Sequence, residues 1–546
     1  METWETVESD VLVIGSGGAG LRSAIEAREA GAEVTLVSKS SIGRGNNTAV
    51  AGSAMAAAGR CREDSPDVHV RDTLQAGRYL NDRCLAGVLA RGAEQQLYDL
   101  ERFGVEFAKE GDGYFVLNLP SHTYPRVVKP RQGIGTGLTL PLARHAASLG
   151  VRTLEKILIT KLLRRDGAVI GALGIDAEAR PLVFHANSVV LASGGLGRLF
   201  ERTTNTPGAT GDGYVLAYEA GAELQDMEFV QFLPATLSTN TKRLFLYEAF
   251  IESGAVFTNR LGEDVALRHG MERPVHLTRD RVARAIMTEI LEGRGIDGAV
   301  HLDFGPISEE RWRELAGMRS RSKSLRNLER RAYPVAPSAH FAMGGVRIND
   351  RCETGVPGLL AAGEVCGGVH GANRLGPNAL TEIFVFGKLA GRTAAEHAAR
   401  ARTKPLDREE IEPELRRLRA VGPRTGSEEL ETLRKALGEL MWRRGGIVRS
   451  SEGILGGLTD LRLEKEKLSR ARVASPRELW HALELRHLFL VAEMILTSAA
   501  IRTESRGAHF RSDFPEEDPR WLKNIVLREA GGSLNASAGD ALPEPS

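Results

Sequence analysis

A glycine-rich turn between an apolar strand and a helix constrains this chain more than any other feature. Residues 11–14 (VLVI) form an unbroken apolar run, Gly15, Gly17 and Gly20 follow as GxGxxG, and residues 21–30 have helical spacing. The first glycine permits a tight turn, the second lets a pyrophosphate touch the backbone, and the third packs the helix on the strand. The setting therefore predicts a Rossmann-like α/β domain that binds a dinucleotide.

The rest of the chain divides into segments that differ in residue composition and pattern. Further apolar strands are expected at 34–37, at 188–193 before Gly194, and in the GLLAAGE run that begins at Gly358. Residues 237–344 carry mixed charge and fewer apolar clusters, which indicates an inserted domain. Ser475-Pro-Arg-Glu478 is a capping box that opens a long helix. The expected divisions are a dinucleotide-binding domain in two parts (1–236 and 345–403), the insertion (237–344), a helical domain (404–530) and a disordered tail (531–546).

Composition excludes several classes of protein. The 546 residues carry a net charge of +1, so no strong field favours nucleic acid or an anionic membrane. The four cysteines form no CxxC pair, which predicts no metal site and places any iron–sulfur relay on a separate chain.

The first strand is expected near residue 9, which leaves no room for a leader, and no apolar run reaches the ~18–20 residues of a membrane span. A cytoplasmic location is expected, free or peripheral on the cytoplasmic membrane face through a partner. The basic run from Arg319 to Arg331 is expected to be a solvated helix face.

One position departs from the simple dinucleotide fingerprint. The second strand ends in Ser38-Lys39, where an acidic residue usually binds the ribose hydroxyls. This argues against a plain NAD domain.

Eight segments together resemble the flavoprotein subunit of succinate dehydrogenase and fumarate reductase, and its relative L-aspartate oxidase. They occur in the family's order from residue 9 to about 522: SDVLVIGSGGAGLRSA, TLVSKSSIGRGNNT, VVLASGGLGR, TGDGYVLAYEAGAELQDMEFVQF, RDRVARAIMTEI, AHFAMGGVRI, GLLAAGEVCGGVHGANRLGPNAL and ESRGAHFRSDFPEED. The resemblance implies an FAD domain with an inserted α+β capping domain and a C-terminal helical domain.

The resemblance also implies which residues contact FAD. They are Gly15, Gly17, Gly18, Ala19, Gly20, Ser38, Lys39, Gly43, Arg44, Asn47, Thr48, Gly52, Ser193, Gly194, Asp212, Glu364, Asn378, Ala379 and Leu380. Membrane-bound members attach FAD through a histidine at the position of Asn47. Because an amide cannot form that bond, FAD is expected to bind noncovalently.

Four residues match the family's reacting centre. His340 and Arg374 correspond to the residues that hold one substrate carboxylate, a task that suits the planar guanidinium fork. Arg279 corresponds to the arginine that donates or accepts the proton, and Glu248 to the glutamate of its relay. Taken alone, Arg279 reads as an ordinary helix-start residue and His340 as a core histidine, so these roles are implied by the resemblance.

Three positions depart from the family's pattern. Leu233 replaces a histidine of QFHPT, and Tyr247 and Ile251 replace a threonine and an arginine of TEGCRGEGG. The lost histidine and threonine hold the second carboxylate, and each such hydrogen bond contributes roughly 1.5–3 kcal/mol. Leu233 and Tyr247 are therefore expected at a less polar second end of the substrate. Glu252 is a hypothetical substitute for the relay arginine.

Three functions follow from these residues. The leading one is hydride transfer between flavin N5 and a C=C bond beside a carboxylate, with fumarate/succinate or a less polar enoate as substrate and with an iron–sulfur protein on a separate chain as partner. The second is L-aspartate oxidase, disfavoured because that enzyme also uses the missing histidine and arginine, and usually has Ser-Asn-Ser where Pro377-Asn378-Ala379 stands. The third is an electron-relay or scaffold protein with a degenerate pocket.

Overall fold

The computed structural model describes residues 4–52, 54–119, 121–132, 134–238, 247–271, 278–317, 327–401, 405–422 and 425–540, with residues 247–249 described by backbone only. The expected basic run lies partly outside these ranges, since residues 318–326 are not among them.

A seven-stranded sheet forms the base of the molecule, in the order β8-β2-β1-β11-β10-β9, with β18 also paired to β11. Its strands are β1 (Glu5–Ile14), β2 (Val34–Ser38), β8 (Arg152–Glu155), β9 (Leu158–Arg165), β10 (Ala168–Ile175), β11 (Pro181–Leu191) and β18 (Leu359–Ala361). β1 pairs in parallel with β2 and β11, while β10 and β9 form an antiparallel extension. The apolar runs expected at 11–14, 34–37 and 188–193 fall in β1, β2 and β11, buried as a central parallel sheet requires.

Two helices of this domain pack closely against each other, because glycines leave no side chains between them. α1 (Gly18–Glu29) lies against α12 (Asn378–Arg400). A Cβ at Gly387 would stand 2.8 Å from the carbonyl oxygen of Ala19, and one at Gly391 would stand 2.3 Å from that of Ser23. Further helices of this domain are α2 (Asn47–Val50), α3 (Pro66–Ala76), α4 (Arg83–Arg102), α5 (Thr136–Ser148) and α6 (Asp212–Glu219).

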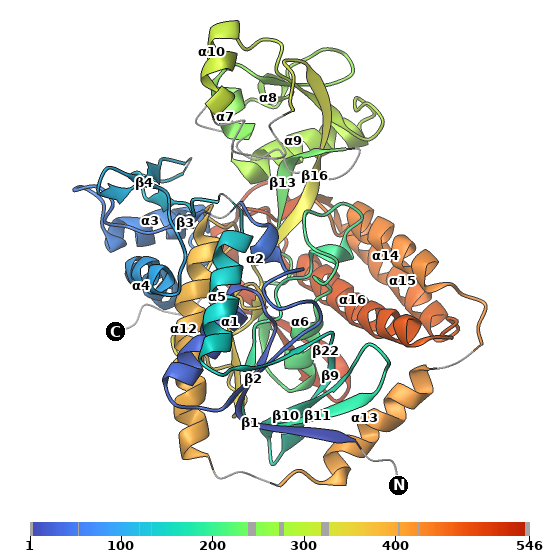
Figure 1. Cartoon of the computed structure of the whole chain (residues 1–546). Coiled ribbons are helices and arrows are strands. Elements are labelled where there is room, and N and C mark those ends of the chain that lie inside the picture. The colour runs from blue at the N-terminus through green and yellow to red at the C-terminus, as the bar shows by residue number, and fades with distance from the viewer. Residues whose placement is uncertain are drawn as a thin grey trace.

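The inserted region builds a second sheet that stands apart from the first (Figure 1). Its order is β13-β16-β15-β14, from β13 (Val230–Leu237), β14 (Val256–Thr258), β15 (Val300–Asp303) and β16 (Ala332–Ala342). The helices are α7 (Tyr247–Glu252), α8 (Val265–Arg268), α9 (Arg279–Leu291) and α10 (Glu309–Glu314). This region has a hydrophobic core of its own, drawn from residues between Leu233 and Val335. We call it the cap.

The C-terminal region is mainly helical, with α13 (Arg408–Val421), α14 (Leu430–Arg444), α15 (Ser451–Leu468) and α16 (Pro476–Ile501). The capping box is present: Ser475 Oγ accepts from the Glu478 amide at 3.2 Å, and Pro476 is the first helical residue. The later apolar positions of this helix, including Leu483, Val491 and Ile495, are fully buried.

The expectation of a disordered tail is wrong for residues 533–540. They form β22 (Ser533–Asp540), which pairs antiparallel with β21 (Lys523–Ala530) along its whole length. Gly531 and Gly532 have positive φ and make the hairpin turn that connects them. The small polar composition of the segment concealed the strand, because backbone pairing to β21 holds it along its whole length and only Leu534 and Ala536 pack against the main core. Residues 541–546 lie outside the described part.

The remaining strands are short. A four-stranded sheet joins β17 (Gly345–Val346), β12 (Leu224–Gln225), β21 and β22. In a three-stranded sheet, β7 (Val127–Val128) pairs with both β3 (Met55–Ala56) and β6 (Val116–Leu117). Two further pairs are β4 (Lys109–Glu110) with β5 (Gly113–Tyr114), and β19 (Val448–Arg449) with β20 (Phe510–Arg511). None of the described helices is both long and apolar enough to cross a bilayer.

Candidate active site and cofactor cleft

One cavity of about 2590 Å³ runs from the carboxyl ends of β1, β2 and β11 to the underside of the cap. Single-ligand pockets usually measure ~300–1,000 Å³, so this space accommodates a dinucleotide together with a second small molecule. Its wall includes most of the predicted cofactor residues and, farther along, Arg279, His340 and Arg374. The fold thus brings the two predicted sites into one continuous space.

The glycine turn has three distinct steric roles. Gly15 has a φ of +114°, a conformation that a side chain would strain. A Cβ at Gly20 would lie 1.7 Å from the carbonyl oxygen of Gly15, so helix α1 can approach β1 only with glycine there. At Gly17 the nearest atom to such a Cβ is Thr48 Oγ1 at 3.5 Å, so this face of the turn is open to the cavity. The helix N-terminus is therefore available to a phosphate group.

The end of β2 carries a buried charge cluster. Lys39 Nζ donates to Asp212 Oδ2 at 2.6 Å and to Glu484 Oε1 at 2.8 Å, and His487 Nδ1 lies 2.8 Å from Asp212 Oδ1. Burial opposes ionisation of Asp212, but Lys39 and His487 outweigh it and hold the pKa of this carboxyl below its usual range. Lys39 and Asp212 both line the cavity, yet their strongest partners are each other.

Asn47 joins the cofactor region to the reacting centre. Its Nδ2 donates to Asn205 Oδ1 at 2.8 Å and to Glu364 Oε2 at 3.3 Å, and its Oδ1 accepts from the Thr206 amide at 3.0 Å. Asn205 in turn donates to the carbonyl oxygen of His340 at 2.9 Å. Burial raises the pKa of Glu364 to about 7. The carboxyl of Glu364 is therefore poised between its charged and neutral forms beside the cavity.

Four predicted cofactor residues do not line this cavity: Gly20, Gly43, Arg44 and Asn378. Gly20 serves helix packing, as described above, and Arg44 is exposed. Asn378 is buried, with its Oδ1 2.8 Å from His69 Nε2 and its Nδ2 donating to Thr73 Oγ1 at 2.9 Å. Its side chain fixes the first turn of α12, while the neighbouring Ala379 and Leu380 face the cavity.

Arg374 is the most strongly buried cation of the reacting centre. Its Nη2 donates to Gln231 Oε1 at 2.9 Å, and its guanidinium lies 4.6 Å from the ring centroid of Phe341. Burial, then the positive charge of Arg279, lowers the pKa of Arg374 to about 9. Among the described residues its Nε has no hydrogen-bond partner. A buried donor beside a cavity is an unfilled site for a carboxylate.

Arg279 and His340 face the same space from the cap. Arg279 is the first residue of α9, and a Cβ at Gly376 would lie 3.5 Å from its Nη1. His340 is on β16, and its Nδ1 lies 2.8 Å from Thr204 Oγ1. The hydroxyl of Thr204 fixes the orientation of the ring, since His340 Nδ1 contacts it directly. Two guanidinium groups and one imidazole thus surround this part of the cavity.

Leu233 does not contact this cavity, contrary to the expectation. It is 5 % exposed and belongs to the separate core of the cap. The pairing of β13 with β16 shifts register between Gln231 and Phe232, where β16 carries one extra residue, His340. Gln231 contacts Arg374, while Leu233 packs in the core of the cap.

The cap helix α7 carries the other departures. Tyr247 and Glu248 begin this helix, and their side chains lie outside the described part of the structure. Ile251 is buried in the core of the cap, and Glu252 is exposed. The hypothetical relay role of Glu252 thus has no support from its position.

Two residues of the site were missed by sequence reasoning. Gln231 Nε2 donates to Asn373 Oδ1 at 2.9 Å and to the carbonyl oxygen of Arg374 at 3.1 Å. Asn373 Nδ2 donates in turn to Asp280 Oδ1 at 3.1 Å. Both amides stand inside segments that carry the resemblance (MEFVQF and HGANRLG), beside residues to which roles were given. That adjacency was the available signal.

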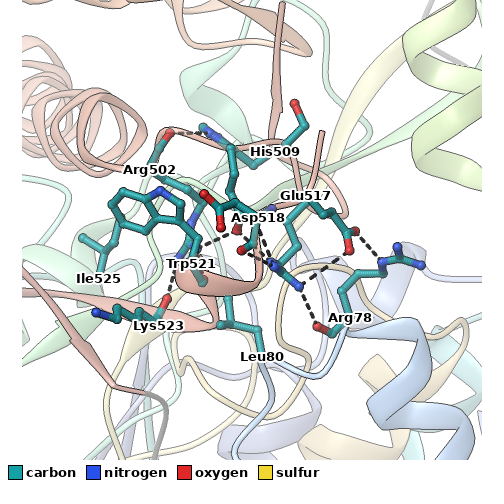
Figure 2. Close-up of polar contacts among 12 residues, drawn as sticks. Arg78, Leu80, Arg502, His509, Glu517, Asp518, Trp521, Lys523 and Ile525 are labelled. Atoms are coloured by element: carbon teal, nitrogen blue, oxygen red, sulfur yellow. Dashed lines mark hydrogen bonds and ion pairs between the residues drawn. The ribbon is translucent and has the colours of Figure 1, made fainter. Parts of the chain in front are cut away.

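The far end of the cavity opens beside a cluster of charged residues. Arg78 Nε donates to Glu517 Oε1 at 2.7 Å, and Arg506 Nη1 donates to the carbonyl oxygen of Arg78 at 3.2 Å (Figure 2). Arg78, Arg506 and Glu517 all line the cavity, and half of the Arg78 side chain is exposed. This cluster therefore places a partly exposed ion pair on the wall of the cavity.

The residues present fit a dinucleotide. The Gly17 side of the turn leaves space at the start of α1, and the buried Oγ of Ser193, on the cavity wall, has no hydrogen-bond partner among the described residues. The described residues contain no group of three or more His, Cys, Asp or Glu side chains placed to hold a metal.

The sequence and fold of this chain are similar to those of known proteins over nearly its whole length. Residues 10–380 match a family model described as an FAD binding domain, and residues 434–537 match one described as fumarate reductase flavoprotein C-term. The chain is 39% identical over 537 residues to one subunit of the fumarate reductase (CoM/CoB) of Methanothermobacter marburgensis, covering 96% of this chain and 97% of the relative. It is 34% identical over 536 residues to the L-aspartate oxidase of Bacillus subtilis, covering 97% and 96%. Among solved structures, "Mycobacterium smegmatis Sdh1 in complex with UQ1" superposes with a TM-score of 0.89 at 34% identity, covering 98% of this chain and 94% of that chain.

Proposed function

Because this chain belongs to the succinate dehydrogenase and fumarate reductase flavoprotein family, and is thus an FAD-dependent oxidoreductase that acts on CH–CH bonds, we propose that it interconverts fumarate and succinate in this cavity. The competing substrate class is an enoate with a less polar second end. The observation that supports the proposal is that Arg279, Arg374 and His340 share one cavity with the dinucleotide cleft.

Arg374 and His340 hold one carboxylate of the substrate. Arg374 is oriented by Gln231 and by the Phe341 ring, so its remaining donors are directed before the substrate arrives. Burial excludes water from this guanidinium, which strengthens its attraction to a carboxylate. The preference for fumarate over a less polar enoate depends on which side chain takes the place of the family histidine that Leu233 replaces. Because Leu233 lies in the core of the cap, it does not make the wall apolar.

Arg279 handles the proton at the substrate carbon. Bound FAD would give a hydride to the substrate or take one from it, which is a transfer of two electrons. Arg279 stands at the start of α9 beside Gly376, where its guanidinium delivers a proton to the second carbon in the reductive direction or removes it in the oxidative one. Glu248 at the start of α7 is the proposed source of that proton.

The proposal extends to binding mode and partner. FAD binds noncovalently, since Asn47 occupies the attachment position and uses its amide to bind Asn205, Glu364 and Thr206. Electrons are exchanged with an iron–sulfur subunit on a separate chain. We place the protein in the cytoplasm, with peripheral attachment to the membrane only through such a partner.

Reoxidation of the reduced protein tests the function. The purified flavoprotein is reduced anaerobically, and fumarate, crotonate, acrylate and cinnamate are added in turn while flavin absorbance is followed. Fumarate is expected to reoxidise the flavin fastest. Arg279→Gln is expected to slow this step by roughly 10²–10⁴-fold, the usual contribution of a positioned acid, with FAD affinity unchanged. A faster reaction with a monocarboxylate would select the competing class. Peroxide production with L-aspartate would select the oxidase, and inertness toward every compound would contradict the proposal.

A further inference from the structure

Two charged side chains of helix α9 in the cap contact other parts of the protein. Asp280 and Arg284 are four residues apart and so lie on the same face of this helix. Asp280 Oδ1 accepts from Asn373 Nδ2 at 3.1 Å, and the Arg284 guanidinium carbon lies 4.4 Å from the ring centroid of Phe510. Asn373 belongs to the FAD domain and Phe510 to the C-terminal region. One helix face therefore joins three parts of the molecule.

The Arg284–Phe510 contact is partly withdrawn from water. Burial lowers the pKa of Arg284, and the carboxylates of Asp280 and Glu516 only partly offset it. Arg284 also lines the cavity, on the same wall as Arg279. A guanidinium that is partly desolvated gains more from an aromatic face than an exposed one does.

The ring of Phe510 stands on a rigid support. Phe510 is the first residue of β20, which pairs with β19, and both of its neighbours in sequence are buried. His509 Nδ1 lies 2.7 Å from Arg449 Nη1. The other ring nitrogen of His509 lies 3.3 Å from the carbonyl oxygen of Arg502 (Figure 2). Arg511 Nε donates to Asp513 Oδ1 at 2.9 Å. Both neighbours of Phe510 thus anchor it to the C-terminal region.

We propose that Arg284 is a positioning residue: by stacking on Phe510 it ties α9 to the C-terminal region and sets where Arg279 stands relative to Arg374. The inference rests on the proposed role of Arg279. Because α9 is one continuous helix of 13 residues that begins at Arg279, a shift at Arg284 moves Arg279 with it. A misplacement of about 1 Å at a reacting group lowers turnover strongly.

Four variants test the contact through turnover. Arg284→Met keeps the length of the side chain without its charge, and Phe510→Leu removes the ring. Each is expected to lower kcat roughly 3- to 30-fold, the range of a partly desolvated cation–π pair, with little change in KM and none in FAD affinity. The double variant is expected to be no slower than the worse single one, since both changes remove one interaction. Arg284→Lys is expected to restore part of the rate, because an ammonium also binds a ring face.

The matched control is Arg313→Met, which removes an exposed arginine of the cap that bonds only within its own helix α10 among the described residues. Wild-type kcat in Arg284→Met, or additive losses in the double variant, would overturn the proposal.

Hydrogen–deuterium exchange separates this proposal from the proposed function. Peptides that cover α9 and β20 are expected to exchange faster in Arg284→Met than in the wild type or in Arg313→Met. If the wild type proves inert toward every enoate while α9 and β20 still loosen, the contact stands and the proposed function fails. If exchange in α9 is unchanged, the contact does not hold the helix and the proposal fails, whatever the turnover.

Discussion

Arg374 combines burial, a nearby positive charge and an aromatic ring beneath its guanidinium. The first two lower its pKa to about 9, which still leaves it charged near neutral pH. Gln231 and Phe341 fix its plane, so the geometry of its fork matters as much as its charge. The side chain is thus suited to bind a planar carboxylate.

Replacing Arg374 with lysine tests this reading of the residue. Arg374→Lys retains a charge but loses the fork and the contact to Gln231. Hydrogen bonds to charged groups contribute roughly 1.5–3 kcal/mol each, so KM for the substrate is expected to rise about 10- to 100-fold. Steady-state kinetics measures it, with Arg351→Lys on the exposed surface as the control. An unchanged KM would show that the carboxylate binds elsewhere.

Glu364 predicts a pH dependence of cofactor affinity. Its pKa of about 7 means that the carboxyl is protonated below neutrality and ionised above it. The ionised form is the better acceptor for a cofactor hydroxyl, so FAD is expected to bind the apoprotein more tightly as pH rises from about 6 to about 8. Glu364→Gln is expected to abolish this dependence. Fluorescence titration with FAD measures it.

The same group acts on the stability of the apoprotein with the opposite sign. Its folded pKa is raised from 4.5 to about 7, so the stabilising proton is lost as pH rises through that window. Asp226, whose pKa is also raised to about 7 by burial and Glu228, does not line the cavity. Asp226→Asn is therefore the control, and it should leave the pH dependence of FAD affinity in place. Loss of that dependence in this control would contradict the assignment to Glu364.

At the scale of elements, the turn between β1 and α1 contains glycines with different tasks, one in folding and one in binding. Gly20 permits the contact of the helix with the strand, since a Cβ there would stand 1.7 Å from a backbone oxygen. Gly17 has no backbone neighbour so close, and its open side faces the cavity. The same motif thus contains one glycine needed by the fold and one needed by the ligand.

Two alanine substitutions are expected to differ accordingly. Gly20→Ala should lower the melting temperature of the apoprotein or prevent folding, because the helix must move away from β1. Gly17→Ala should leave the melting temperature of the apoprotein nearly unchanged while the purified protein loses FAD. Thermal unfolding and the ratio of FAD to protein measure the two effects. Equal losses of stability in both variants would refute the distinction.

At the scale of the whole molecule, the cap and the main domain have separate hydrophobic cores and share one cavity. Arg279 and His340 come from the cap, whereas Arg374 and the predicted cofactor residues come from the main domain. The proposed reacting centre therefore exists only when the two are docked. The described cysteines are free, and two of them, Cys352 and Cys366, are buried.

The residues of this chain predict which cofactors the purified protein contains. Denaturation in acid or detergent is expected to release all of the flavin, because Asn47 offers no group for a covalent bond. The purified chain is also expected to contain FAD and no stoichiometric iron, because its cysteines are dispersed. Flavin fluorescence in a denaturing gel and metal analysis check both. A fluorescent protein band, or iron in proportion to protein, would contradict the prediction.

Much of the architecture was predictable from local patterns. The GxGxxG turn, the apolar runs of β1, β2 and β11, and the capping box at Ser475 were each located from sequence, because short-range sterics and hydrogen bonds decide them. The polar tail was not, because β22 depends mainly on its partner strand β21. Its two core-packing side chains, Leu534 and Ala536, are too few to give a clear hydrophobic pattern in the sequence.

The amino-acid sequence by itself determined the dinucleotide domain and the order of segments that place the chain in its family. Tertiary structure alone decided which side chains meet. On β13, Gln231 contacts Arg374 while Leu233 packs in the core of the cap, and the docking of α9 brings Arg284 onto Phe510, more than two hundred positions away in the chain. The physical reason is that such contacts depend on register and domain placement, which arise from the packing of distant segments and not from the residues adjacent in sequence.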